Sequence, residues 1–320
     1  MPTDANGGGD AARRTRDERP TEHRLPDATR LGPVRLQVAD VERSLAFHRD
    51  VLGLRVSARE GARVELAAHG DDRLLVELHR VPGTRPARRS GRLGLYHLAI
   101  ALPDRPSLGR FAQHLIELGV RAGSADHLVS EAFYLDDPDG LGVEVYADRP
   151  RTTWRRVGGE LVMGTDPLDV DDLVRAAAGA PWRGGPAGSR IGHVHLHVGD
   201  LREAATFYGQ GLGFDRTVWS YPSALFLGAG GYHHHVGVNT WAGPAATPSE
   251  ADESRLMEWT IEVPEGADLA AVANRLAAIG VAVERAGTGL AVRDPWGQAV
   301  RIVTAGAPLD VPGLRGGRSP

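Results

Sequence analysis

The 320-residue sequence contains no cysteine, and this absence excludes several kinds of chemistry at once. Without a thiol there is no disulfide, no thiolate zinc site and no cysteine nucleophile. Any metal ion that side chains bind here must therefore use histidine, aspartate or glutamate, together with water.

An excess of positive charge and a long apolar run are also missing. The formal net charge is −4, so the chain lacks the basic surface that nucleic-acid binding requires. No apolar stretch approaches the roughly 20 residues of a membrane-spanning helix, and the N-terminus carries no apolar signal core. We therefore expect a cytoplasmic protein that binds neither nucleic acid nor membrane.

Length and composition predict two domains with disordered ends. At roughly 150 residues per domain the chain is long enough for two, and 42% hydrophobic residues can form their cores. Residues 1–28 are rich in Gly, Arg and Asp, so we expect a disordered tail that contains a solvated His23. Residues 307–320 have a similar composition and are expected to form a second tail.

The most informative property of the sequence is that it repeats itself. The stretch VRLQVADVERSLAFHRDVLGLRV (34–56) matches VHLHVGDLREAATFYGQGLGFDR (194–216), at an offset of 160 residues. Each copy predicts an alternating strand, an aspartate N-cap (Asp40 or Asp200) and an amphipathic helix closed by glycine.

A second unit follows in each half of the chain. Its first strand is predicted at 96–103 or 258–264, and it closes on a DPxG turn, in DPDGLGVEVY (137–146) or DPWGQAVRIV (294–303). The sequence thus predicts an α+β fold of four βαβββ modules, which begin near positions 33, 97, 193 and 258. The predicted divisions are a first domain (31–150), a linker with a short helix (151–187) and a second domain (188–306).

Four such modules, with GHVHLHV, AFHRDVLGL and DPDGLGVEVY, resemble the vicinal oxygen chelate superfamily of glyoxalases, bleomycin-resistance proteins and extradiol dioxygenases. Within it, SADHLVSEAFYLDDPDG and GGYHHHVGVNTWAG are similar to two-domain catechol 2,3-dioxygenase-like proteins. The resemblance implies an oxidoreductase of aromatic catabolism that uses Fe(II) and dioxygen to open the ring of a catechol-type diol beside its hydroxyls. A homo-oligomer is compatible with it.

Equivalent inward positions of the modules suggest the metal ligands. At this position of their first strands, modules one to four have Pro33, His97, His193 and Glu258. At the matching position of the last strand, module two has Glu144 and module four has Arg301. Together His97, Glu144 and His193 make a two-histidine, one-carboxylate set, which suits a non-haem Fe(II) centre and also accepts Mn(II).

The same alignment predicts that the other two modules have no metal site. Proline cannot ligate through its side chain, and Glu258 and Arg301 are expected to pair with each other. Because a metal cup in this superfamily forms between two modules, modules two and three must pair, within one chain or between subunits. Pairing one with two and three with four would separate His193 from His97.

Two more histidines share the inward face of the strand with His193, because side chains alternate along a strand. His195 is therefore the rival metal ligand. For His197, burial without a metal is the preferred interpretation.

Strand alternation also predicts how the three consecutive histidines lie. His233 and His235 would point inward and His234 outward, with Gly237 at the position that Glu144 has in module two. The triple histidine is then not the metal cage. From the resemblance, His235 is expected to be the pocket histidine that handles a proton near the metal, since the usual pKa of histidine lies near neutrality.

Two further pocket residues follow from the resemblance. Tyr134 matches the tyrosine that hydrogen-bonds the bound diol in extradiol enzymes, and His127 matches a pocket histidine of that family. With His235, they complete the expected catalytic set.

Two other functions remain open from the sequence. A glyoxalase-like lyase or isomerase would use Zn or Ni with a further carboxylate ligand, and Gly237 disfavours this because it supplies none. A drug-binding protein of the bleomycin-resistance kind would need no metal ligands. Under either function, an aromatic pocket or the core could hold the tryptophans Trp219, Trp241, Trp259 and Trp296.

Overall fold

A computed structural model describes residues 24–88 and 90–307. The expected C-terminal tail beyond residue 307, and the expected N-terminal tail through His23, lie outside these ranges. No helix in the described ranges is long and apolar enough to cross a membrane.

The end of the expected N-terminal tail is ordered, which corrects the prediction for residues 24–28. Leu25 is buried, and its N–H donates a hydrogen bond of 2.9 Å to the carbonyl oxygen of Gly213. Arg24 forms an ion pair of 3.1 Å with Asp215. One apolar side chain in the core fixes this segment, an effect that average composition does not reveal.

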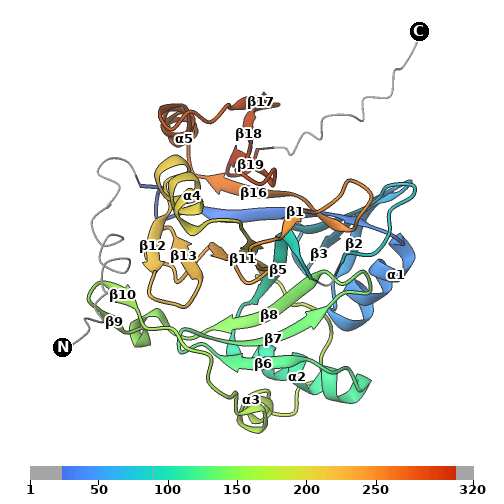
Figure 1. Cartoon of the computed structure of the whole chain (residues 1–320). Coiled ribbons are helices and arrows are strands. Elements are labelled where there is room, and N and C mark those ends of the chain that lie inside the picture. Colours follow the sequence, from blue (N-terminus) through green and yellow to red (C-terminus); the bar gives the residue numbers. More distant parts are fainter. Residues whose placement is uncertain (1–23, 89, 308–320) are drawn as a thin grey trace, which may run out of the picture.

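The chain folds into four βαβββ modules, as the repeat predicts (Figure 1). The first two modules consist of β1 (Arg30–Val38), α1 (Val41–Ala46), the π-helix η1 (Phe47–Val51), β2 (Arg55–Glu60), β3 (Arg63–Ala67) and β4 (Leu74–Arg80), and then β5 (Arg92–Leu102), α2 (Arg105–Leu118), β6 (Gly123–Asp126), β7 (Ser130–Asp136) and β8 (Gly142–Asp148). The last two consist of β11 (Arg190–His197), α4 (Leu201–Ala204), the π-helix η3 (Ala205–Gly211), β12 (Asp215–Val218), β13 (Ala224–Gly228) and β14 (Val236–Asn239), and then β16 (Arg255–Val263), α5 (Gly266–Ala278), β17 (Glu284–Ala286), β18 (Gly289–Arg293) and β19 (Ala299–Thr304).

A few short elements lie outside the modules. The linker contains η2 (Arg151–Thr153), the hairpin β9 (Arg156–Val157) and β10 (Glu160–Leu161), and the expected short helix, α3 (Val170–Ala176). The two-residue strand β15 (Thr247–Pro248) pairs with β5.

The helices begin where the sequence predicts. The side chain of Asp40 accepts hydrogen bonds from the backbone N–H groups of Glu42 and Arg43, and Asp200 caps α4 in the same way. Each of these helices continues into a π-helical segment before the following strand.

The two sheets pair the modules across the halves of the sequence. A nine-stranded sheet has the order β12-β13-β14-β11-β5-β8-β7-β6, with β15 as the ninth strand paired to β5. It joins modules three and two through the antiparallel pair β11 and β5. An eight-stranded sheet with the order β17-β18-β19-β16-β1-β4-β3-β2 joins modules four and one. Modules two and three thus pair within one chain, which is the arrangement that the predicted ligand set requires.

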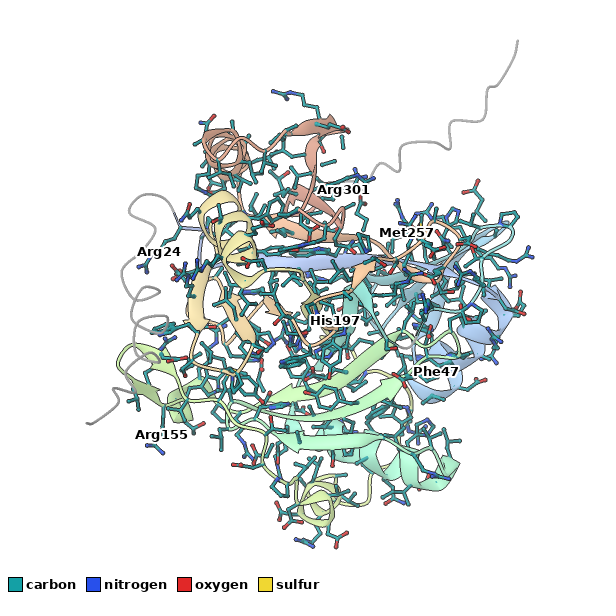
Figure 2. All side chains as sticks on the ribbon, in the orientation of Figure 1. Arg24, Phe47, Arg155, His197, Met257 and Arg301 are labelled. Carbon is teal, nitrogen blue, oxygen red and sulfur yellow. The ribbon has the colours of Figure 1, made fainter. Side chains whose placement is uncertain are left out.

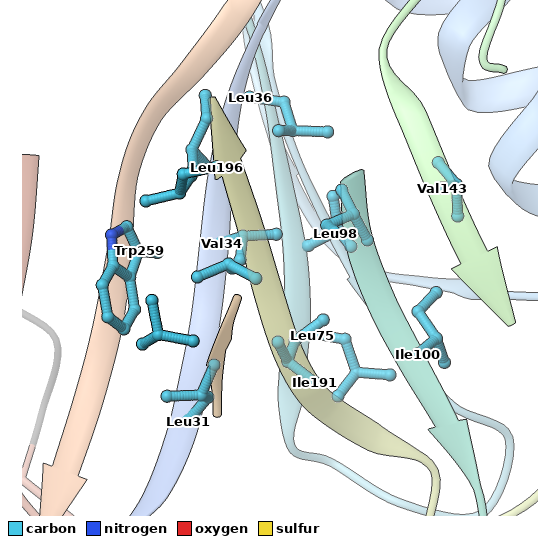
Figure 3. Close-up of a cluster of buried hydrophobic side chains, with 14 of the residues drawn as sticks. Leu31, Val34, Leu36, Leu75, Leu98, Ile100, Val143, Ile191, Leu196 and Trp259 are labelled. Atoms are coloured by element: carbon cyan, nitrogen blue, oxygen red, sulfur yellow. The ribbon is translucent and has the colours of Figure 1, made fainter. Parts of the chain in front are cut away.

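The hydrophobic core joins the two sheets (Figure 3). Leu98 and Ile100 of β5 belong to one buried cluster with Val34 and Leu36 of β1. Because side chains alternate along a strand, the face of β5 that carries His97 is turned away from this cluster. That second face of the nine-stranded sheet forms the site.

Candidate metal centre and active site

Three buried side chains on adjacent strands of the nine-stranded sheet converge on one point. Nε2 of His97 and Nε2 of His193 each lie 3.0 Å from Oε2 of Glu144, and 3.3 Å from one another. The strand register brings them together, because Ala99 of the central strand β5 pairs with His193 on one side and with Glu144 on the other. The short alanine side chain leaves room for both neighbours to reach His97.

The chemistry of this donor set suits a divalent cation. Burial lowers the pKa of His193 to about 4, although Glu144 opposes the shift. Burial alone would raise the pKa of Glu144, but His193 and His97 lower it well below its usual value. Lone pairs of imidazole and carboxylate therefore face one another, roughly 3 Å apart, as neighbouring ligands about 2.1 Å from one metal ion do.

A cavity of about 340 Å³ lies over the three donors. Its wall is aromatic, with Tyr96, Tyr221, Phe226 and Trp241, and Met163 to Thr165 of the linker close one side. Among the described residues that line it, there is no arginine or lysine. A site of this size, with an aromatic wall and with histidine and tyrosine groups that face its interior, can bind a small aromatic ligand that carries polar substituents.

Tyr134 and His127 both line the cavity, where the sequence analysis expected them, and they are hydrogen-bonded to each other. Nδ1 of His127 donates to the carbonyl oxygen of Gly164 over 2.6 Å, so its Nε2 accepts from the Tyr134 hydroxyl over 2.5 Å. Burial, together with the nearby Glu144, raises the pKa of Tyr134 well above its usual value. The Tyr134 oxygen can therefore accept a hydrogen bond from a ligand while its O–H donates a hydrogen bond to His127.

His195 lines the cavity but is not part of the converging donor set. The backbone N–H of Trp241 donates to Oδ1 of Asn239, so the amide Nδ2 of Asn239 faces His195 and donates to its Nε2 over 2.9 Å. His197 donates to the same Oδ1 over 2.7 Å and does not line the cavity. This geometry disfavours His195 as the rival ligand, and it places the half-buried His197 outside the cavity.

The prediction for the triple histidine is wrong in its geometry. His234, not His235, lines the cavity, and its ring centroid lies 4.1 Å from that of His193. His235 instead accepts a hydrogen bond from the backbone N–H of Ala229 and contacts Phe214. The three residues belong to the turn before β14, where the alternation of a strand does not apply.

His233 connects this turn to the end of β8. Its Nε2 donates to Oδ1 of Asp148 over 2.9 Å, and its Nδ1 lies 2.7 Å from Nδ1 of His234. Burial alone would raise the pKa of Asp148, but the contacts with His233 and Arg190 hold it below its usual value. Burial lowers the pKa of His234 well below its usual value, so its ring is neutral near pH 7.

The equivalent position of the eight-stranded sheet is filled by ion pairs. Arg301 forms two hydrogen bonds with Glu258, at 2.8 and 3.0 Å, which confirms the predicted pairing. Glu77, the register equivalent of Glu144, contacts Arg35 and Arg63 at 2.8 Å each. Figure 2 labels Arg301 among the C-terminal strands, and it labels His197, which lies on the same strand as His193, near the middle of the molecule. In the eight-stranded sheet, guanidinium groups thus fill the space that corresponds to the cluster of His97, Glu144 and His193.

Several cavity residues were missed by the sequence analysis. His234 was excluded by the strand alternation, and the linker residues Met163 and Thr165 carry no pattern that marks them as part of a site. Of the four tryptophans singled out, Trp241 lines the cavity, whereas Trp259 is fully buried in the core. The other two, Trp219 and Trp296, pack against the core.

Comparison with known proteins identifies the family. The family model of the Glyoxalase/Bleomycin resistance protein/Dioxygenase superfamily matches residues 30–145 and 190–302. A catechol-2,3-dioxygenase of Bacillus subtilis (strain 168) is 44% identical over 274 residues, which cover 85% of this chain and 95% of that protein.

Solved structures share the fold. A structure assigned as a dioxygenase of Bacillus subtilis subsp. subtilis strain 168 matches with a TM-score of 0.62 at 13% identity, covering 90% of this chain and 88% of that chain. Glyoxalase I of Zea mays matches with a TM-score of 0.51 at 15% identity, covering 87% and 92%. With two family repeats and a dioxygenase relative along most of its length, the chain belongs to the glyoxalase, bleomycin resistance protein and dioxygenase superfamily and is an oxidoreductase.

Proposed function

We propose that the chain is an Fe(II)-dependent extradiol dioxygenase that opens the ring of a catechol-type aromatic diol beside its hydroxyls. The observation that carries the proposal is the convergence of His97, Glu144 and His193 in a cavity of about 340 Å³, in a chain related to a catechol-2,3-dioxygenase. Two histidines and one carboxylate leave open positions on a metal ion, as a ligand that binds through two oxygens and a dioxygen molecule require.

In this proposal His97, Glu144 and His193 hold the iron. Bound iron supplies the redox chemistry through which dioxygen reacts with an aromatic ring, which amino-acid side chains cannot supply. The aromatic wall of Tyr96 and Trp241 orients the ring and excludes water. The same ligands accept Mn(II), so a parallel reconstitution with Mn(II) would show which of the two metals supports activity.

The other cavity groups bind the diol and manage its proton. Tyr134 accepts a hydrogen bond from one hydroxyl of the diol, because its own O–H already donates a hydrogen bond to His127. His234, rather than the predicted His235, is placed to exchange a proton with the diol, because its ring lines the cavity beside His193. His127 acts through Tyr134, since both of its ring nitrogens are engaged.

The cavity does not favour the other two functions. A glyoxalase-like centre needs a further carboxylate ligand, and module three has Gly237 at that position. A protein that only binds a drug has no use for three buried donor atoms within 4.8 Å of one another. A cytoplasmic location and a homo-oligomer stay predictions that cell fractionation and light scattering can test.

Anaerobic reconstitution with Fe(II), followed by catechol and air, tests the proposal. We expect a yellow ring-fission product from the parent protein and none from Glu144→Gln. Glu258→Gln, which changes the glutamate paired with Arg301 in the other sheet, should leave the amount of product unchanged. Stoichiometric metal without any product would point to a lyase or to a different diol. A parent protein that binds no metal would remove the proposal.

A further inference from the structure

Two of the three consecutive histidines form a hydrogen-bonded chain that runs from the cavity to a carboxylate. Oδ1 of Asp148, at the end of β8, lies 2.9 Å from Nε2 of His233, whose Nδ1 lies 2.7 Å from Nδ1 of His234. His234 lines the cavity, and within residues 24–88 and 90–307 its Nε2 has no hydrogen-bond partner. That nitrogen is the free end of the chain, facing the space where a ligand binds.

Asp148 determines the direction of these hydrogen bonds. Its carboxylate also accepts from Arg190 over 2.9 Å and from the hydroxyl of Tyr232 over 3.1 Å, so it has only an accepting role. Nε2 of His233 must then be the donor to Asp148. Because a neutral imidazole has a single N–H, Nδ1 of His233 accepts, and the proton between the two rings belongs to Nδ1 of His234.

We propose that Asp148 and His233 are positioning residues that fix His234 in the tautomer whose Nε2 accepts a proton in the cavity. A histidine next to a metal site can in principle present either an N–H or a lone pair to a ligand. Here the partner of the other ring nitrogen makes the choice, as a hydrogen-bonded carboxylate does for histidines that orient towards a metal or a nucleophile. With a neutral His233 ring, the tautomer follows from the hydrogen bonds, whereas its catalytic use rests on the proposed function.

The same chain provides a place for the accepted proton. When a hydroxyl of a bound diol gives its proton to Nε2 of His234, the Nδ1 proton of His234 moves to Nδ1 of His233. One O–H and one N–H bond break, two N–H bonds form, and no electrons are gained or lost. His234 ends neutral, and the positive charge resides on His233 beside the Asp148 carboxylate. The reverse transfer returns the proton to the cavity.

The tautomer can be measured directly in the full-length protein without a metal. In long-range ¹H–¹⁵N correlation spectra of protein labelled with ¹⁵N-histidine, the His234 signals are those that vanish in His234→Phe. We expect His234 to be protonated at Nδ1 in the parent. Asp148→Asn should introduce the Nε2-protonated form, because an amide at position 148 can donate to His233 and reverse the chain.

Tyr232→Phe is the matched control. It removes another donor to Asp148 but keeps the ring that lies 4.2 Å from His233, so the His234 tautomer should not change. A parent His234 protonated at Nε2, or a tautomer that Asp148→Asn leaves unchanged, would overturn the inference.

Kinetics of the iron-loaded enzyme test the catalytic use. We expect Asp148→Asn to lower kcat about 10- to 100-fold with KM changed by less than about 3-fold, since positioning partners typically have effects of this size. In the His234→Phe background, Asp148→Asn should have no further effect, because Asp148 acts through His234. If Asp148→Asn lowered kcat in the His234→Phe background by the same factor as in the parent, this role of Asp148 would be overturned. A parent protein with the expected tautomer but no ring-opening activity would instead remove the proposed function.

Discussion

Glu144 and Gly237 occupy the same position in the two modules that build the nine-stranded sheet. Glu144 is in register with the residue two after His97, and Gly237 pairs with His195, which is two after His193. The sheet therefore offers a single carboxylate to its metal site. The missing side chain also makes room, because a Cβ on Gly237 would lie 2.9 Å from Cγ of His195.

Removal of the one carboxylate should strongly weaken metal binding. We expect Glu144→Gln to weaken Fe(II) or Mn(II) affinity by on the order of 100-fold or more, since even partners outside the ligand set affect affinity 10- to 100-fold. Metal analysis after gel filtration measures it. Glu258→Gln, in the sheet without a donor set, should retain one metal per chain, and loss of metal from both variants would contradict a site at Glu144.

Any side chain at Gly237 should disturb His195. Gly237→Ala places a methyl group against the His195 ring, so we expect a loss of about 1–3 kcal/mol in the free energy of unfolding. Gly266→Ala is the control, because its Cβ would meet no atom within 4 Å and alanine favours the helix. Denaturant titration of both variants measures their free energies of unfolding. If Gly237→Ala were as stable as Gly266→Ala, the sheet would have accommodated the methyl group without strain.

The ion pairs in the eight-stranded sheet should contribute to stability rather than to function. Arg301→Met removes two hydrogen bonds from the half-buried Glu258 carboxylate and leaves it Arg35 at 3.9 Å, so we expect a loss of about 1–3 kcal/mol in the free energy of unfolding. Combining it with Glu258→Leu should recover at least half of that loss, because no uncompensated charge remains. Thermal and denaturant unfolding would contradict this if the double variant were less stable than Arg301→Met alone.

The two DPxG turns differ in how their first carboxylate is satisfied. Oδ1 of Asp137 accepts from two backbone N–H groups, but among the described residues its buried Oδ2 has no partner. In the counterpart turn, Oδ2 of Asp294 accepts from the Tyr208 hydroxyl over 2.7 Å. Burial raises the pKa of Asp137 to about 7.

This raised pKa predicts a pH-dependent stability. The folded protein keeps the Asp137 proton up to about pH 7, whereas the unfolded chain loses it near the usual aspartate pKa of 3.8, so the free energy of unfolding falls as the pH rises between these values. The slope from this group is at most about 1.4 kcal/mol per pH unit. Relative to the parent, Asp137→Asn should therefore gain stability from pH 5 to pH 7. Denaturant titrations at several pH values test it, with the exposed Asp171→Asn as control, and a difference independent of pH would contradict it.

The cavity lining predicts a preference among diols. A catechol that bears a carboxylate would bury its charge near Glu144 with no arginine or lysine among the described lining residues. We expect kcat/KM for catechol or an alkylcatechol to exceed that of a carboxylated catechol by about 10-fold or more. Thr165→Arg, at the exposed edge of the cavity, should reduce the ratio of the two kcat/KM values, because it adds a cation near the ligand. Equal kcat/KM of the parent for both diols would contradict this prediction.

Strand periodicity accounts for what the sequence analysis found of the site. His97, His193 and Glu144 were recognisable because they fall at equivalent positions of repeated modules, and a period of two fixes the face of every residue in a strand. The same rule failed for residues 233–235, because these residues form a turn in which neighbouring side chains are not directed by a pleat. The roles of His97, Glu144 and His193 as metal ligands, and of His234 as a proton carrier, stay predictions until the experiments above are done.

By itself, the sequence determined the four modules, the starts of the helices at Asp40 and Asp200, and the three residues that converge under the cavity, because these depend on local patterns that recur along the chain. Only the tertiary structure decided that modules two and three share a sheet within one chain, and that His233 reaches Asp148. The tertiary structure also revealed that linker residues line the cavity. His233 and Asp148 are 85 residues apart in the sequence. No local propensity records which distant surfaces meet when the two sheets close over a common core.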